Sequence, residues 1–70
     1  PTFTPIQLEA KLALALMKEN KIDQAQEQVK HMLTVAIGSG KEAAQVVAEA
    51  LQKGDLELAG RRLAELSGRQ

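Results

Sequence analysis

The chain has 70 residues, with nine basic and nine acidic side chains, no cysteine and a single aromatic residue, Phe3. This length accommodates one domain, and the lack of cysteine excludes disulfides, so oligomerisation is the expected extra source of stability for so small a core. Acidic and basic residues are nearly balanced within each segment of the chain, which argues against a role on nucleic acid or on a membrane surface. No apolar run approaches the roughly 18 residues of a membrane span and no signal peptide is visible, so we expect a cytoplasmic protein.

The first expected helix covers residues 5–19. Thr4 is a favourable N-cap, and Pro5 suits the first helical position, where no backbone N–H is needed. Asn20 tolerates the left-handed backbone conformation that ends many helices. We therefore expect a turn at Asn20, although the pattern also permits one continuous helix through this position.

Two apolar stripes distinguish this first helix. At about 100° per residue they lie on nearly opposite sides. One stripe consists of Leu8, Leu12 and Leu16, and the other of Ile6, Ala10, Leu14 and Met17. A helix that is apolar on most of its circumference needs cover from more than one side. We therefore expect it to be the centre of a bundle or the contact between two copies.

Residues 22–37 form the second expected helix. Its apolar stripe, with three- and four-residue spacing, consists of Ile22, Ala25, Val29, Met32, Leu33 and Ala36. Val35 lies off this stripe. His31 is the only histidine and falls on the polar side, one turn after Glu27, so we expect these two side chains to pair.

The clearest break in the chain is Gly38-Ser39-Gly40. Ser39, with Glu42 three residues later, has the spacing of a capping box, so a third helix is expected over residues 39–53. Its expected buried stripe consists of Ala43, Val46, Val47, Ala50 and Leu51.

A fourth helix is expected after Gly54, which suits the end of the third helix, and Asp55, which suits an N-cap. Its expected buried stripe consists of Leu56, Ala59, Leu63 and Leu66. Leu58 lies off this stripe, and Gly68 is expected to end the helix. Ion pairs between residues four apart are expected at Glu49–Lys53, Glu57–Arg61 and Glu65–Arg69.

The two halves of the chain share a pattern at an offset of 34 residues. Asn20, Ile22, Ala25 and Val29 correspond to Gly54, Leu56, Ala59 and Leu63. The period and the Gly-Asp-Leu-x-x-Ala turn resemble tetratricopeptide repeats, which stack helix pairs of 34 residues. The family's Trp, Gly and aromatic positions are occupied by other residues, which are Glu9, Ala13 and Leu16 in the first half. The resemblance therefore implies helical hairpins, but it does not assign any binding residue to this chain.

The sequence contains no arrangement typical of an enzyme or of a cofactor site. Gly38-Ser39-Gly40-Lys41 lacks the first glycine and the final Ser/Thr of a phosphate-binding loop, which also requires a preceding strand. His31 has no second metal ligand at helical spacing, and neither Ser39 nor Ser67 has a histidine nearby. We therefore expect a non-enzymatic protein without a cofactor or a bound metal.

A DNA-binding regulator is the alternative, built from a helix-turn-helix-like pair at residues 41–67. Arg61 and Arg62 are available for phosphate contacts. However, Gly60 occupies the position where such a pair needs an apolar packing residue. The same helix also carries three acidic residues, Asp55, Glu57 and Glu65. These carboxylates would oppose binding to a phosphate backbone.

Together these patterns predict an all-α fold, a single domain over residues 1–70. Four short helices are expected as two hairpins, residues 5–37 and 39–67, in an antiparallel bundle completed by dimerisation. The expected function is that of a self-associating protein–protein interaction module, such as an adaptor, a small chaperone or a regulatory subunit, with a homodimer as its first assembly. The expected interaction surface consists of Leu8, Leu12, Leu14, Leu16, Met17, Val35 and Leu58.

Overall fold

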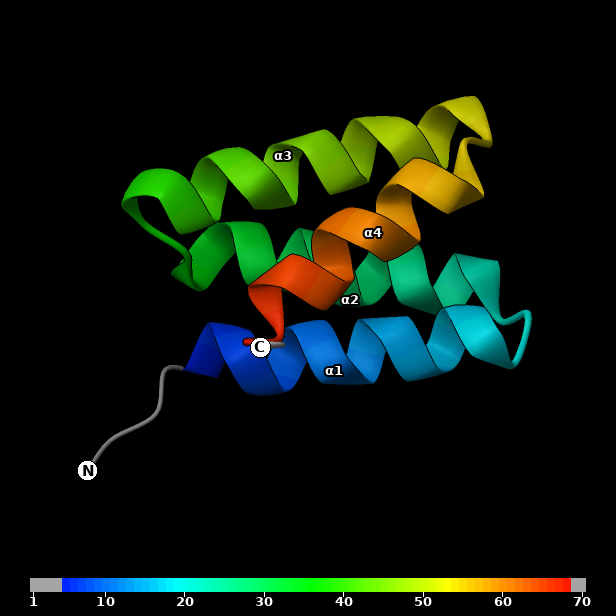
Figure 1. The fold of residues 1–70 in the computed structure, drawn as a ribbon, viewed down its shortest axis with the longest axis horizontal. Coiled ribbons are helices and arrows are strands. Elements are labelled where there is room, and N and C mark those ends of the chain that lie inside the picture. The colour runs from blue at the N-terminus through cyan, green and yellow to red at the C-terminus, as the bar shows by residue number, and fades with distance from the viewer. Residues whose placement is uncertain (1–4, 69–70) are drawn as a thin grey trace.

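Four helices make up the computed structural model, which describes residues 5–68 (Figure 1). They are α1 (Pro5–Lys18), α2 (Ile22–Val35), α3 (Gly38–Lys53) and α4 (Leu56–Leu66). Each helix packs against the next one, and α4 also packs against α1, so the four helices close into a ring. The predicted all-α bundle of two hairpins is therefore confirmed. Because α4 returns to α1, the second hairpin folds back over the first instead of extending an open stack.

The turns inside the two hairpins have the same hydrogen-bond pattern, 34 residues apart. Asn20 has a φ of 64° and Gly54 a φ of 84°, the left-handed conformation that ends a helix. Beyond each, the next backbone N–H reaches back five residues, from Lys21 to the carbonyl of Leu16 and from Asp55 to that of Ala50, both at 2.8 Å. The predicted turn at Asn20 and the predicted end at Gly54 are confirmed.

Asp55 caps α4 as its chemistry predicts. Its carboxylate accepts a hydrogen bond from the backbone N–H of Leu58 at 3.2 Å, which satisfies one of the donors that the first turn of a helix leaves unpaired. Thr4, the predicted cap of the first helix, lies outside the described residues.

The predicted capping box at Ser39 and Glu42 is wrong. α2 ends at Val35, two residues earlier than expected, and Ile37 occupies the N-cap position of α3 in an extended conformation with no side-chain cap. Gly38, with a φ of 61°, reverses the chain one residue before Ser39. Ser39 therefore already lies in the first turn of α3, where its hydroxyl cannot take the N-cap position.

The core is built mainly from small side chains. Its larger fully buried members are Met32, Leu63, Val29 and Val47. Around them lie the alanines Ala10, Ala13, Ala25, Ala44, Ala50 and Ala59, none more than 3% exposed. Alanine at the contacts lets helices approach closely, because interaxial distance depends on the side chains between them.

The buried face of α3 is rotated from the predicted one. Ala44 is fully buried and Ala43 only half-buried, while Val46 is 38% exposed. This rotation follows from the neighbours of α3, since α2 and α4 both pack on the side that carries Ala44, Val47 and Leu51. Leu56, also predicted to be buried, is 40% exposed because it is the first residue of α4.

The single-helix ion pairs of the described residues join side chains three positions apart, not four. Glu27 pairs with Lys30 at 3.7 Å, and Glu65 with Arg62 at 3.0 Å. All four side chains are well exposed, so each pair contributes little to stability.

The two ends of the described chain lie close together. A Cβ atom added at Gly68 would be 2.8 Å from Nε2 of Gln7, so the second residue after α4 sits against the first turn of α1. This contact belongs to the same closure that joins α4 to α1.

Candidate functional site

The outer face of α1 is the candidate site. The bundle covers only one of the two stripes predicted on this helix: Ala10 and Ala13 are fully buried, and Leu14 packs against the core. On the other side Leu8 and Leu12 are each 51% exposed and Leu16 is half-buried. We call Leu8, Leu12 and Leu16 the α1 outer stripe. A helix face this apolar and open to solvent is the kind of feature that marks an interaction site.

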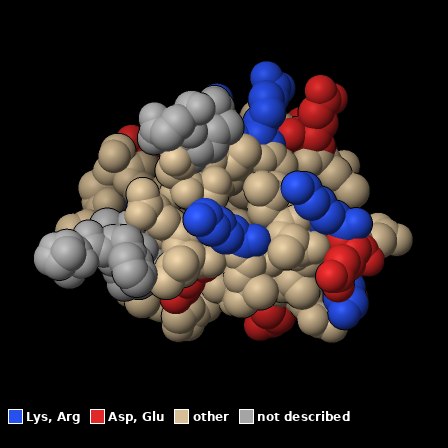
Figure 2. Space-filling view, turned by 60° about the horizontal axis from the view of Figure 1, so that its bottom comes forward, with Lys and Arg blue, Asp and Glu red and all other residues tan. Residues whose placement is uncertain are grey.

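One edge of the α1 outer stripe is basic. Lys11 and Lys18 lie seven positions apart, which places them on the same side of the helix, and both are exposed. Neither makes an ion pair with any residue of the described chain. In Figure 2, where the α1 side of the molecule comes forward, blue Lys and Arg side chains cross a largely uncharged surface and most acidic side chains lie toward its margins.

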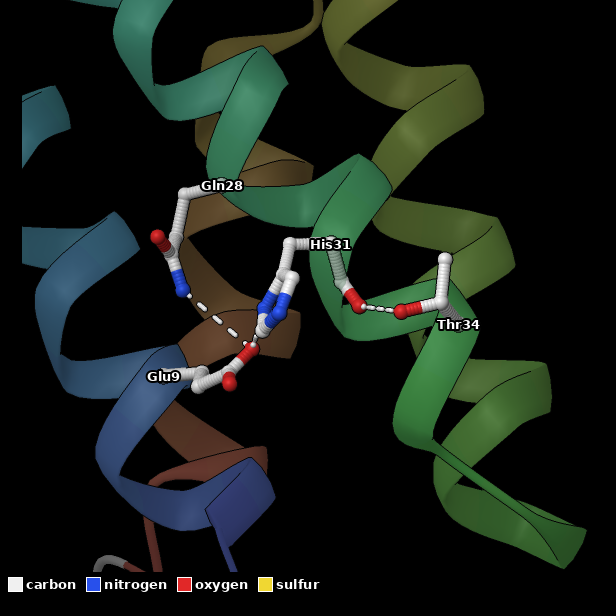
Figure 3. A network of polar contacts seen from close by, with 4 residues as sticks. All are labelled: Glu9, Gln28, His31 and Thr34. Carbon is white, nitrogen blue, oxygen red and sulfur yellow. Dashed lines mark hydrogen bonds and ion pairs between the residues drawn. The ribbon is translucent and has the colours of Figure 1, made fainter.

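The opposite edge is a polar contact between α1 and α2 (Figure 3). Oε1 of Glu9 lies 2.8 Å from Nδ1 of His31 and accepts a hydrogen bond from Nε2 of Gln28 at 3.3 Å. We call these three residues the Glu9 cluster. The Glu9 side chain is 18% exposed and that of His31 is 60% exposed. Glu9 therefore has its charge engaged within the molecule, while the histidine ring borders solvent.

The predicted pairing of His31 with Glu27 is wrong. Glu27 pairs with Lys30, and His31 contacts Glu9, which lies 22 positions earlier in the chain. Sequence spacing identifies partners within one helix, whereas this contact arises from the packing of α1 against α2. The backbone carbonyl of His31 also accepts a hydrogen bond from the Thr34 hydroxyl at 2.6 Å.

The remaining residues of the predicted surface lie elsewhere. Leu14, Met17 and Leu58 pack against the core of the bundle. Val35 is 45% exposed at the end of α2. The structure also exposes an apolar residue that was not singled out, Ile37, which is 84% exposed between α2 and α3. The sequence feature that indicates this exposure is the glycine that follows Ile37, because a break there leaves Ile37 outside both helices.

A shallow hollow lies between α2 and α3. Its volume is about 120 Å³, and it is lined by Gln26, Lys30, Ala48, Leu51 and Gln52. Sites that enclose small molecules are larger, at roughly 300–1,000 Å³. The Gln26 amide already donates to the Leu51 carbonyl at 3.3 Å. Within residues 5–68, no three His, Asp or Glu side chains are grouped as metal ligands.

The pair α3 and α4 is the one on which the DNA-binding alternative depends. The two helices pack against each other, and Gly60 lies half-buried near the middle of α4 with no Cβ to pack. Arg62, one of its two candidate phosphate ligands, is paired with Glu65. DNA binding stays a prediction, and a shift of labelled duplex at low salt would support it.

No protein-family model, curated protein or solved structure matches this chain. None of the helices within the described part of the chain combines the length and apolarity needed to cross a bilayer.

Proposed function

We propose that this chain is a non-enzymatic protein–protein interaction module that binds through the α1 outer stripe. The observation that supports the proposal is the pair Leu8 and Leu12, one helical turn apart and each 51% exposed, on a helix whose other stripe is buried. An adaptor, a small chaperone or a regulatory subunit would use such a surface. Self-association, predicted from the sequence, would use the same face.

The leucines alone do not supply a stable complex. Completing the burial of two half-exposed leucines contributes about 1.5–3 kcal/mol in total. Even a millimolar dissociation constant corresponds to about 4.1 kcal/mol. A standard interface covers about 800 Å² on each partner, against a total surface of 4652 Å² for this molecule. A partner must therefore also contact the edges of the stripe and parts of the neighbouring helices.

A binding experiment with a synthetic helix tests the proposal. The probe is a peptide of about 20 residues with a leucine stripe at helical spacing and glutamine along both edges. Amide NMR shifts of the labelled protein on titration are expected to concentrate around Leu8, Leu12 and Leu16. Sedimentation with interference optics reports self-association, because the chain has no Trp or Tyr.

The matched control uses exposed apolar residues of other helices. Leu8→Glu/Leu12→Glu is expected to remove peptide binding and any self-association while helical circular dichroism is retained. Val46→Glu/Leu56→Glu, at residues 38% and 40% exposed on α3 and α4, is expected to change neither. Peptide-induced shifts centred on α3, or equal loss of binding in both double variants, would contradict the proposal.

A further inference from the structure

We propose that the occupant of the α1 outer stripe is an amphipathic helix of another protein that carries Asp or Glu along one edge of its apolar stripe. This inference rests on the proposed function and adds the chemistry of the partner. It is drawn from the charges that border the stripe.

The lysine edge of the α1 outer stripe carries positive charge that is not paired within the described chain. Lys11 and Lys18 are exposed, and no acidic group of the described chain pairs with them. Lys41, Lys53 and Arg61 are also without an ion pair in the described chain, but they lie on α3 and α4, whereas Lys11 and Lys18 border the exposed leucines of α1. Seven positions correspond to two turns, about 10.5 Å along the helix. Two carboxylates spaced two turns apart on a partner helix would match this edge.

The opposite edge of the α1 outer stripe, formed by the Glu9 cluster, has no carboxylate or ammonium group without a protein partner in the described chain. The Glu9 carboxylate is mostly buried and is engaged by His31 and Gln28. The two edges therefore differ: the ammonium groups of the lysine edge face water with no protein partner among residues 5–68, and the Glu9 carboxylate already has protein partners. A partner helix needs charge along one side only, and that charge is negative.

A second copy of the chain is the other partner that could cover the α1 outer stripe. In an antiparallel two-fold pairing of α1 helices, like edges meet, which would bring Lys11 against Lys18 of the other copy. A parallel pairing would place the lysine edge against the edge that carries Glu9 and Leu16, where the only carboxylate is already engaged. Glu19 is exposed nearby but pairs with Lys21 at 3.3 Å. Neither pairing of α1 helices brings an unpaired carboxylate of α1 to these lysines, so charge complementarity favours an acidic helix.

The test compares three synthetic helices with the same leucine stripe. Each has about 20 residues, and one edge carries glutamine, glutamate or lysine. Anisotropy of a fluorescein label on the peptide gives the dissociation constants with the intact chain. At about 0.01 M ionic strength the glutamate peptide is expected to bind about tenfold more tightly than the lysine peptide. The ratio is expected to shrink at about 0.1 M.

Two double variants with the same change of charge make the test specific. Lys11→Glu/Lys18→Glu is expected to reverse the order of the glutamate and lysine peptides. Lys41→Glu/Lys53→Glu places the same charges on α3, which lies across the bundle from α1, and is expected to preserve the order. Circular dichroism of both variants checks that the helices are retained.

Failure of this inference is distinguishable from failure of the proposed function. Equal binding of all three peptides, lost in Leu8→Glu/Leu12→Glu, would overturn the acidic partner and leave the binding face intact. A doubled mass that the same leucine variant abolishes, with no peptide bound, would overturn it in favour of a second copy. A monomer that binds none of the peptides would overturn both proposals.

Discussion

The outer faces of α1 and α3 differ in the side chains that they expose. Both helices bury small residues on the inside, Ala10 and Ala13 in α1 and Ala44 and Val47 in α3. The outer face of α3 is polar, with Glu42, Gln45, Glu49, Gln52 and Lys53 exposed around a single valine. In α1 the same position relative to the core carries two leucines, Leu8 and Leu12, each 51% exposed. These leucines have no counterpart on α3, and the proposed binding function accounts for them.

The largest difference in stability is expected between a variant of the inner stripe of α1 and a variant of its outer stripe. Leu14→Glu is expected to lower the free energy of unfolding by about 3 kcal/mol or more, because Leu14 packs against the core and a carboxylate there would lose solvation. Leu12→Glu is expected to cost only about 1 kcal/mol, because about half of this side chain is already in solvent. Urea unfolding followed by circular dichroism measures both. Comparable losses in the two variants would show that the outer stripe is also part of the fold.

Overpacking tests whether the inner faces of α1 and α3 are equivalent. Ala13→Leu and Ala44→Leu, both at fully buried sites, are each expected to cost about 1–3 kcal/mol, because no space is available for the added carbons. Thermal or urea unfolding reports the loss. Tolerance at Ala13 alone would mean that α1 packs less tightly than α3, and the contrast between the helices would then lie in the core as well.

The two hairpin turns allow a smaller, matched comparison. Gly54→Ala is expected to cost about 1–2 kcal/mol, purely from the positive φ of 84°, since a Cβ there meets nothing within 4 Å. Asn20→Ala is expected to cost less, because asparagine already has a Cβ in this conformation. Asn20→Gly serves as the control and is expected to be neutral or slightly stabilising. A destabilised Asn20→Gly protein would point to a role for the amide side chain.

The smallest effect concerns the Glu9 cluster at one edge of the α1 outer stripe, compared with an exposed ion pair on α2. Glu9→Gln is expected to cost about 0.2–1 kcal/mol, since it weakens a partly exposed contact between α1 and α2. Glu27→Gln, at a pair that is more than 70% exposed, is expected to cost less. Two-dimensional NMR of His31 gives an independent readout, since only Glu9→Gln should shift its ring signals. Equal shifts in both variants would contradict the contact between the helices.

Local chemistry was enough to predict most of the fold, because the signals lie within a few residues of the feature they create. Asn20, Gly54 and Asp55 each set their own turn or cap. One error was local, because Gly38 begins α3 one residue before Ser39 and displaces the predicted capping box. The other errors occurred where packing between helices decides the outcome. The rotation of α3 depends on α2 and α4, and the contact between Glu9 and His31 joins residues 22 positions apart.

The candidate site was half predictable for the same reason. The sequence shows that α1 has two apolar stripes. A helical wheel does not indicate which of the two stripes faces the core. Only the placement of α2 and α4 leaves Leu8 and Leu12 outside and takes Leu14 and Met17 inside. Lys11 and Lys18 are likewise unpaired because the packing of the helices brings no carboxylate of the described chain within ion-pair distance of them.

The closed ring of helices has a topological consequence. Because Gly68 lies against Gln7, a short linker could join the two ends, and the chain could be reopened at Ile37, which is 84% exposed between α2 and α3. The resulting circular permutant would read α3–α4–α1–α2 and would keep all four helix contacts. We therefore expect the bundle to form with the two hairpins in either order along the chain. The α1 outer stripe would remain in place while its helix moved to the middle of the sequence.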